Sequence, residues 1–320
     1  MTGGSLGDVA GVAPAAMRPH GPKTGPAKTS DGPGLLDDVR AMGRALCSPT
    51  GLAGVALEAS WIGLHLGLWP LGHIGSRRSD QRGGYRLGHL SPTQRGLAVH
   101  NIEAAETPIL LVHGMVDNRS IFTVLRHGLR RRGFGRIETM NYSILTGDVR
   151  RAAAHLGEEV ERIVAETGYE RLHVIGHSLG GLIARYYVTR LGGDERVDTL
   201  VTLGTPHRGT YVAYGWTNGL TRQLRPGSAL FAELDAPIPR CRTRFVVYSS
   251  DIDQLVVPQR NAGLHHPDLN VHNVALRGIG HMSLPITRSV VHGISSTLAH
   301  LDVTGATVTP GVIPLEQRRA

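Results

Sequence analysis

From about Asn101 onward, short apolar runs alternate with amphipathic stretches, and this alternation limits the possible folds more than any other feature. A run such as Pro108–His113 (PILLVH) has the length of one buried strand. The segment between Asp148 and Gly168 instead places apolar residues on one face of a helix. Because strands that alternate with helices form parallel sheets covered on both faces, the sequence predicts an α/β fold with a mainly parallel sheet.

The predicted elements follow one another in a regular order, without an internal repeat. Strands are expected at Pro108–His113, Arg136–Tyr142, Arg171–Ile175, Val197–Leu203, Arg244–Tyr248 and Asn270–Leu276. Helices are expected after Asp148, at Leu179–Leu191 and from Ser283, where Pro285 would lie in the first turn. With 41% hydrophobic residues among 320, the chain can bury a substantial core.

Composition divides the chain into four segments. Residues 1–34 are rich in Gly and Pro and are expected to form a disordered tail. Residues 35–96 are an apolar helical segment with a connector, residues 97–304 the α/β domain, and residues 305–320 a C-terminal tail.

The apolar segment at residues 51–71 approaches the length of a membrane span, but Glu58 and His65 interrupt it. A charge is costly inside a bilayer, so the sequence favours a helix that packs on the domain or lies in a membrane interface. A spanning helix is the less favoured alternative. The segment is therefore the candidate for peripheral contact with a membrane or lipid surface.

The net charge of +8 could indicate a nucleic-acid partner. The cluster Arg130–Arg132, however, follows a helical segment without interleaved aromatic residues, which is typical of a solvated helix end, so no nucleic-acid partner is predicted. Cys47 and Cys241 are too few and too far apart to indicate a disulfide framework, and their redox state stays open. No standard secretory signal is recognised, so we expect a cytoplasmic or peripherally membrane-associated location.

Gly176-His177-Ser178-Leu179-Gly180 fits the pattern G-x-S-x-G, in which a sharp turn lifts a serine hydroxyl above a sheet. The pentapeptide alone is weak evidence in a chain with 42 glycines. Here, however, it stands between a predicted strand and a predicted helix, as that turn requires. Ser178 is therefore the candidate nucleophile.

A serine hydroxyl needs a base that takes its proton and later returns it to the leaving group. His281 best fits this role among the 17 histidines, because it follows the last predicted strand in a turn containing Gly278 and Gly280. A carboxylate must in turn orient the imidazole. Asp253 in the loop after the preceding strand is favoured, and Asp251, which could instead cap the turn, is the alternative acid.

Stabilising the oxyanion requires two backbone N–H donors. One is expected from Leu179, the residue after the nucleophile, and the other from Met115, in the turn His113-Gly114-Met115 that follows the first strand.

These motifs make the sequence resemble the small bacterial lipases and esterases of the α/β-hydrolase superfamily over about Thr107 to Leu301. The strings that carry the resemblance are ILLVHGM, VIGHSLGGLIARYY, VTLGTPHRGT, VVYSSDIDQLVVP and GIGHMSL. The resemblance implies the α/β-hydrolase fold, with a small lid at about residues 207–240 after the LGTPHRG strand. The residues expected near substrate are His113, Gly114, His177, Tyr211, Trp216 and Leu220.

The resemblance further implies a lipase or carboxylesterase that needs no cofactor and takes an ester or lipid substrate. Acyl transfer, or cleavage of a thioester or amide, on the same triad is an alternative, and an inactive hydrolase-like membrane-associated binding module is another. Some relatives bind a metal ion, but the HHPD string at His265–Asp268 is typical of a polar loop, so no metal is predicted.

Overall fold

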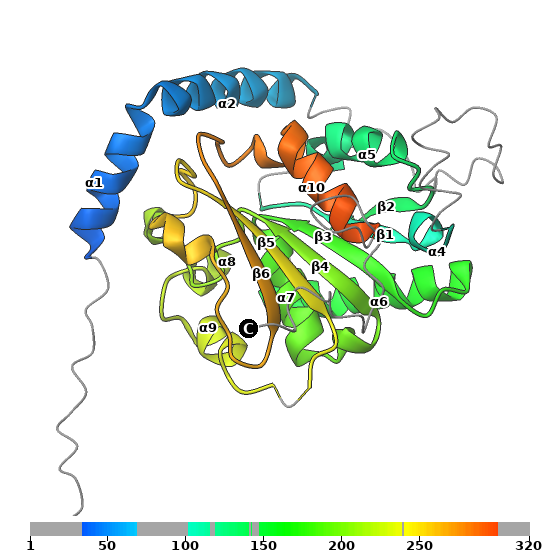
Figure 1. Cartoon of the computed structure of the whole chain (residues 1–320). Coiled ribbons are helices and arrows are strands. Elements are labelled where there is room, and N and C mark those ends of the chain that lie inside the picture. Colours follow the sequence, from blue (N-terminus) through cyan, green and yellow to red (C-terminus); the bar gives the residue numbers. More distant parts are fainter. Residues whose placement is uncertain are drawn as a thin grey trace, which may run out of the picture. The chain divides into compact units, whose positions relative to one another are not determined.

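A six-stranded parallel sheet forms the centre of the α/β domain (Figure 1). The computed structural model describes residues 34–68, 102–115, 119–140, 142, 147–238 and 240–299. The strands are β1 (Ile109–Val112), β2 (Ile137–Met140), β3 (Leu172–His177), β4 (Val197–Leu203), β5 (Arg244–Ser250) and β6 (Asn270–Leu276). Their order is β2-β1-β3-β4-β5-β6. The predicted fold class, a mainly parallel sheet between helices, is confirmed.

Two hydrophobic cores cover the two faces of this sheet. Successive side chains of a strand point to opposite faces, so in β1 Leu110 and Val112 belong to one core and Ile109 and Leu111 to the other. Helices α6 (Val149–Thr167) and α7 (Leu179–Arg190) pack on the first face. Helices α5 (Thr123–Arg130) and α10 (Arg288–Leu298) pack on the second. Both faces are buried, which explains why the strands read as continuous apolar runs.

Helix α6 forms as its sequence predicts. The Asp148 side chain caps it by accepting a hydrogen bond of 2.7 Å from the N–H of Arg150. Gly168 ends it with φ 74°, a left-handed conformation that glycine adopts without strain.

The closing helix begins later than predicted. A short 3-10 turn at Leu284–Ile286 comes first, Thr287 is extended, and α10 begins at Arg288 rather than Ser283. Pro285 has no N–H to donate and restricts the residue before it, which favours a separate turn over a continuous helix.

The segment after β4 packs onto the domain through three short elements: a 3-10 turn at Tyr211–Gly215, α8 (Gly219–Gln223) and α9 (Ala229–Leu234). Leu220, Leu230, Phe231 and Leu234 from this segment join the core on the α6 and α7 side. A lid role for residues 207–240 stays a prediction.

Before the α/β domain come α1 (Leu35–Leu46), α2 (Pro49–Leu68) and α4 (Ile102–Glu106). Helices α1 and α2 belong to the same compact unit as the sheet. Within the described residues no helix is long and apolar enough to cross a membrane. The whole connector after α2, both predicted tails except Gly34, and the first and last few residues of the predicted domain lie outside the described residues.

Candidate active site

The turn between β3 and α7 gives Ser178 the backbone of a nucleophile elbow. Ser178 has φ 54° and ψ −123°, and it is the one non-glycine residue with positive φ among the described residues. Such strain persists only where the surroundings enforce it, and it is typical of functional sites. The flanking glycines are required by space: a Cβ on Gly176 would lie 2.4 Å from Cα of Gly181, and one on Gly180 would lie 2.1 Å from the carbonyl oxygen of Val112.

The loop after β4 braces the elbow. The N–H of Ser178 donates to the carbonyl oxygen of Leu203 at 2.8 Å, and the Thr205 hydroxyl donates to the carbonyl oxygen of Ser178 at 2.9 Å. A Cβ on Gly181 would lie 2.0 Å from Oγ1 of Thr205, so only glycine allows this approach. The LGTPHRG string thus helps to hold the serine turn, a role that the sequence analysis missed.

Asp253 and His281 form a buried pair. Nδ1 of His281 lies 2.8 Å and 3.0 Å from the two carboxylate oxygens of Asp253, and the residues are 1% and 0% exposed. The N–H groups of Leu255 and Val256 also donate to the carboxylate, each at 2.9 Å, which fixes its orientation. With Nδ1 held by Asp253, Nε2 is the ring nitrogen left to act as a base.

The alternative acid Asp251 lies elsewhere in this loop cluster. Its Oδ1 accepts a hydrogen bond of 2.8 Å from the N–H of Gly278, so it stabilises the turn after β6. The structure therefore brings Asp253, and not Asp251, to His281.

The elbow and the histidine loop also meet through His177, which is fully buried. Its ring centroid lies 4.8 Å from that of His281, and its Nε2–H donates to the carbonyl oxygen of His281 at 3.1 Å. His177 therefore packs against the candidate base, and its expected contact with substrate stays a prediction.

The turn after β1 is held in place beside the elbow. The Tyr142 hydroxyl donates to the carbonyl oxygen of His113 at 2.8 Å, and the two rings stack with centroids 4.6 Å apart. His113 is only 2% exposed and supports this turn, and its expected contact with substrate stays a prediction. Gly114 and the half-buried Met115 follow it. Leu179 begins α7, where the first N–H groups have no partner inside the helix. Met115 and Leu179 stay the predicted oxyanion donors.

The remaining expected substrate contacts differ in exposure. Tyr211 is 43% and Trp216 54% exposed, so both could meet a ligand from outside. Leu220 is 8% exposed and belongs to the core, and its expected contact with substrate stays a prediction.

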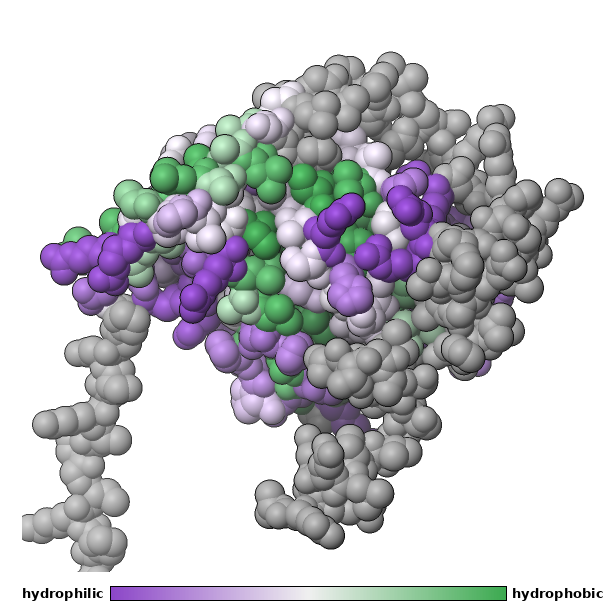
Figure 2. Space-filling model, turned by 45° about the horizontal axis from the view of Figure 1, so that its top comes forward, coloured by the Kyte–Doolittle hydropathy of each residue, from purple (hydrophilic) through white to green (hydrophobic). Residues whose placement is uncertain are grey.

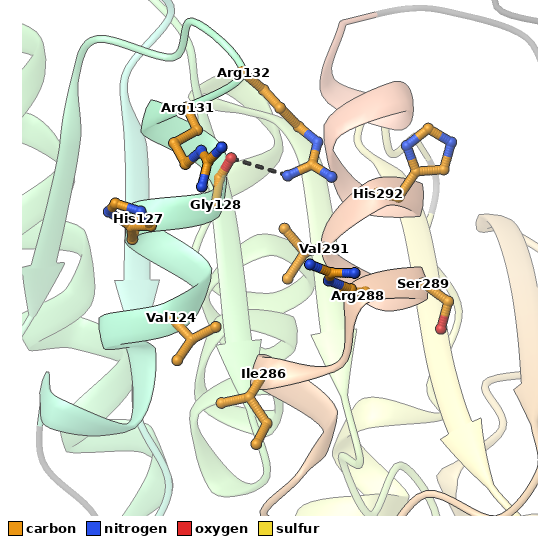
Figure 3. A pocket seen from close by; sticks show the side chains of 10 residues that line it. All are labelled: Val124, His127, Gly128, Arg131, Arg132, Ile286, Arg288, Ser289, Val291 and His292. Atoms are coloured by element: carbon orange, nitrogen blue, oxygen red, sulfur yellow. Dashed lines mark hydrogen bonds between the residues drawn. The ribbon is translucent and has the colours of Figure 1, made fainter.

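Two cavities of the α/β domain are lined by residues other than the candidate triad. The first, of about 720 Å³, lies between α5 and α10; its lining includes the cationic side chains of Arg131, Arg132 and Arg288 (Figure 3). The second, of about 440 Å³, is lined in part by Tyr211 and Phe231. Neither includes Ser178, Asp253 or His281.

Two buried side chains, Arg185 and His207, support the segment after β4. The guanidinium of Arg185 donates to the carbonyl oxygens of His207 and Leu234 and to the carboxylate of Asp235. Burial, with a smaller effect of Arg185, lowers the pKa of His207 well below its usual value. The neutral His207 ring contacts the Thr202 hydroxyl at 2.9 Å, so His207 has a structural place in the motif.

Within the described residues, no group of three or more His, Cys, Asp or Glu side chains is arranged to hold a metal ion. In the HHPD loop, the Asp268 carboxylate instead accepts from the N–H of Ile238 at 2.8 Å, and the His266 ring contacts the carbonyl oxygen of Ala236 at 3.3 Å.

Glu58 of α2 is the residue at this site that the sequence analysis did not foresee. Its carboxylate is 5% exposed and accepts hydrogen bonds from Gln254, Met282 and Ser283, the neighbours of Asp253 and His281. In the sequence, Glu58 stands out only as an interruption of an apolar segment.

Residues 108–258 match a family model described as palmitoyl protein thioesterase. Two triacylglycerol lipases also match in sequence. That of Burkholderia plantarii is 27% identical over 132 residues, covering 39% of this chain, and that of Pseudarthrobacter phenanthrenivorans is 30% identical over 118 residues, covering 34%. In both cases the match spans 36% of the relative's own length.

Solved lipase structures share the fold. A mature lipase of Bacillus licheniformis has a TM-score of 0.51 at 17% identity, covering 61% of this chain and 92% of the lipase. Lipase B of Aspergillus fumigatus has a TM-score of 0.56 at 15% identity, covering 67% of this chain and 56% of that chain. The predicted resemblance is thus confirmed: the chain has the α/β-hydrolase fold and is similar to lipases and esterases that share it.

Proposed function

We propose that the chain is a carboxylic ester hydrolase that forms an acyl-enzyme on Ser178. The observation that carries this proposal is the buried Asp253–His281 pair. His281 contacts His177, the residue that precedes the strained turn at Ser178. A strained serine next to a carboxylate-oriented imidazole is the arrangement that activates a hydroxyl as a nucleophile.

In the proposed reaction, Nε2 of His281 takes the proton of the Ser178 hydroxyl while Oγ attacks the carbonyl carbon of the ester. The N–H groups of Met115 and Leu179 stabilise the oxyanion. The carbon–oxygen bond to the leaving alcohol then breaks, and the imidazolium protonates that alcohol. Water repeats the sequence on the acyl-enzyme and releases the acid. Asp253 stabilises the imidazolium in both steps and stays ionised.

Labelling with a fluorophosphonate tests this proposal. We expect stoichiometric labelling of the wild-type protein, no labelling of Ser178→Ala, and hydrolysis of p-nitrophenyl esters only by the wild type. Protein that neither labels nor hydrolyses a series of acyl chain lengths would be an inactive binding module instead.

The substrate class is proposed as acyl lipids, which the similarity to triacylglycerol lipases supports. A thioester is the second candidate, favoured by the match to a palmitoyl protein thioesterase model. Initial rates on two palmitoyl substrates separate the ester from the thioester as substrate class. The two leaving groups, an alcohol and a thiol, should have the same carbon skeleton. Product analysis with a competing alcohol shows whether the acyl group goes to water or is transferred.

The proposed contact with a lipid surface involves α2. Leu52, Val55 and Leu57 are 61%, 45% and 49% exposed, although each is apolar. Figure 2 shows hydrophobic side chains gathered along the N-terminal helices. A helix with an exposed apolar side can bury it at the boundary between headgroups and acyl chains. Sedimentation with phosphatidylcholine vesicles tests this: we expect the wild type to sediment and Leu52→Asp/Leu57→Asp to stay in solution. Equal sedimentation of both proteins would contradict it.

A further inference from the structure

Helix α2 presents an unusual side to the α/β domain. It buries Gly51, Gly54 and Glu58, at positions i, i+3 and i+7, which share one face of a helix. Gly54 allows the helix backbone to meet the turn after β6: a Cβ on Gly54 would lie 2.2 Å from the carbonyl oxygen of Gly278, whereas one on Gly51 would meet the carbonyl oxygen of Ala45 in α1. Similarly, a Cβ on Gly280 would lie 2.4 Å from Cδ of Glu58. The close approach therefore brings the Glu58 carboxylate against the turn that carries His281.

Both oxygens of this carboxylate are used. Oε1 accepts from the N–H of Met282 at 2.7 Å and from the side-chain amide of Gln254 at 2.8 Å. Oε2 accepts from the N–H of Ser283 at 2.9 Å and from its hydroxyl at 2.7 Å. An acceptor with four donors is the arrangement expected for an ionised carboxylate.

The donors come from two loops of the candidate site. Met282 and Ser283 directly follow His281, and Gln254 directly follows Asp253. The N–H of His281 in turn lies 3.5 Å from Oε1 of Gln254. Glu58 thus connects the loop of the base with the loop of the acid, on the backbone side of the buried His281–Asp253 pair.

A buried carboxylate is costly unless hydrogen bonds replace its water, and a helix that served packing alone would bury an apolar side chain here. Turns such as residues 278–283, rich in glycine, do not by themselves hold a ring to the tolerance that catalysis requires, about 0.5 Å. A rigid helix that binds two consecutive N–H groups of the turn supplies that constraint.

We infer that Glu58 is a positioning residue for His281: through Met282, Ser283 and Gln254 it holds the base in register with Asp253 and Ser178. This inference rests on the proposed function of those three residues. Glu58 lies on α2, which is outside residues 108–258, the region that matches the family model.

The test uses the full-length chain and Glu58→Gln, which keeps the shape of the side chain but turns an amide NH₂ toward one pair of donors. A 1 Å misplacement of a catalytic group can reduce a rate by ~100-fold, so we expect kcat to fall by ~10- to 100-fold while KM changes by less than about twofold. The matched control is Ser60→Ala, on the same helix, where the exposed hydroxyl donates only to the carbonyl oxygen of Ala56. We expect kcat of Ser60→Ala to equal that of the wild type.

Active-site titration with a fluorophosphonate separates positioning from misfolding. If Glu58 positions His281, Glu58→Gln is labelled to the same final stoichiometry as the wild type but at a rate reduced in parallel with kcat. If the variant merely misfolds, the final stoichiometry falls and kcat per labelled site is unchanged, and the inference is overturned. Wild-type protein that does not label at Ser178 contradicts the proposed function itself, so the two failures are distinct.

A double-mutant cycle gives a second, independent readout. Ser283→Ala removes one of the four donors, and we expect it to lower kcat by a few-fold in the wild-type background. In the Glu58→Ala background the same change should have no further effect, because the partner of the hydroxyl is already gone. Two effects that multiply in the double variant would show that Ser283 and Glu58 act separately and would overturn the inference.

Discussion

Helices α6 and α2 belong to the same compact unit, but α6 buries its apolar face whereas α2 buries a carboxylate. Helix α6 buries Val149, Leu156, Val160 and Ile163 and exposes its charged residues to solvent. Helix α2 buries a carboxylate and two glycines and exposes Leu52, Val55 and Leu57.

The difference separates two uses of a helix. The apolar face of α6 completes a hydrophobic core and thereby stabilises the sheet that carries the elbow. The polar contact of α2 fixes the turn beside His281. Substitutions in α6 should therefore change stability, and substitutions on the inner side of α2 should change activity.

Asp253 should give the largest loss of kcat among the residues that hold His281. It binds the imidazole directly, whereas Glu58 of α2 acts through the backbone of the turn. Asp253→Asn should lower kcat by ~10⁴-fold, since the amide no longer fixes the tautomer or stabilises the imidazolium. Steady-state hydrolysis of a p-nitrophenyl ester measures this. The matched control is Asp251→Asn, which loses only the contact with Gly278 and should lower kcat by less than about tenfold. The reverse order would assign the acid to Asp251.

Leu156→Ala tests the packing role of α6. Leu156 is fully buried, so the substitution should lower the free energy of unfolding by about 3 kcal/mol through lost apolar burial and a cavity. Urea denaturation measures the loss, and kcat per titrated site should be unchanged. Arg151→Ala, at an exposed position of the same helix, should leave the unfolding free energy within ~0.5 kcal/mol of the wild type. A large drop in kcat per site for Leu156→Ala would break the comparison.

Gly54→Ala tests the close approach of α2. The added Cβ would overlap the carbonyl oxygen of Gly278 and push the helix from the turn, so kcat should fall by roughly tenfold. Gly63→Ala is the control, because a Cβ there meets no atom within 4 Å. It should stabilise the helix by up to about 1 kcal/mol and leave kcat unchanged. Equal kcat for the two variants would show that the contact with Gly278 does not serve catalysis.

Leu57→Ser tests the outer side of α2 and should have the smallest effect. The side chain is half exposed, so the free energy of unfolding, measured by thermal denaturation, should change by less than ~0.5 kcal/mol. The rate of hydrolysis of a soluble ester should be unchanged. Sedimentation with phosphatidylcholine vesicles should decrease. A clear loss of stability would instead show that this side is covered by another part of the protein.

The sequence could predict what depends on local patterning. Strand and helix positions follow from apolar periodicity and from caps such as Asp148 and Gly168, and the elbow follows from glycines that only a close approach requires. Chain order, with the family resemblance, then brought Asp253 and His281 forward as candidates, and the structure places them together.

What the sequence could not predict depends on contacts distant in the chain. Glu58 lies 196 to 225 positions from its partners, and no motif marks it, although Gly51 and Gly54 on the same helical face were an available signal. The exposure of Trp216 and the burial of Leu220 could not be distinguished because both stand in one apolar stretch. The start of the last helix was misplaced because proline is also common in the first turn of an α-helix, so Pro285 did not mark the separate 3-10 turn that precedes α10.

Trapping the acyl-enzyme tests the central claim most directly. The wild-type protein is quenched with acid during steady-state turnover of a p-nitrophenyl ester, digested, and analysed by mass spectrometry. We predict that the acyl group is found on the peptide that contains Ser178, and that it forms more slowly after mixing in Glu58→Gln because His281 is held less well. An acyl group attached to any other residue would contradict the account. So would turnover without a covalent intermediate, measured with an activated ester whose acylation is faster than deacylation.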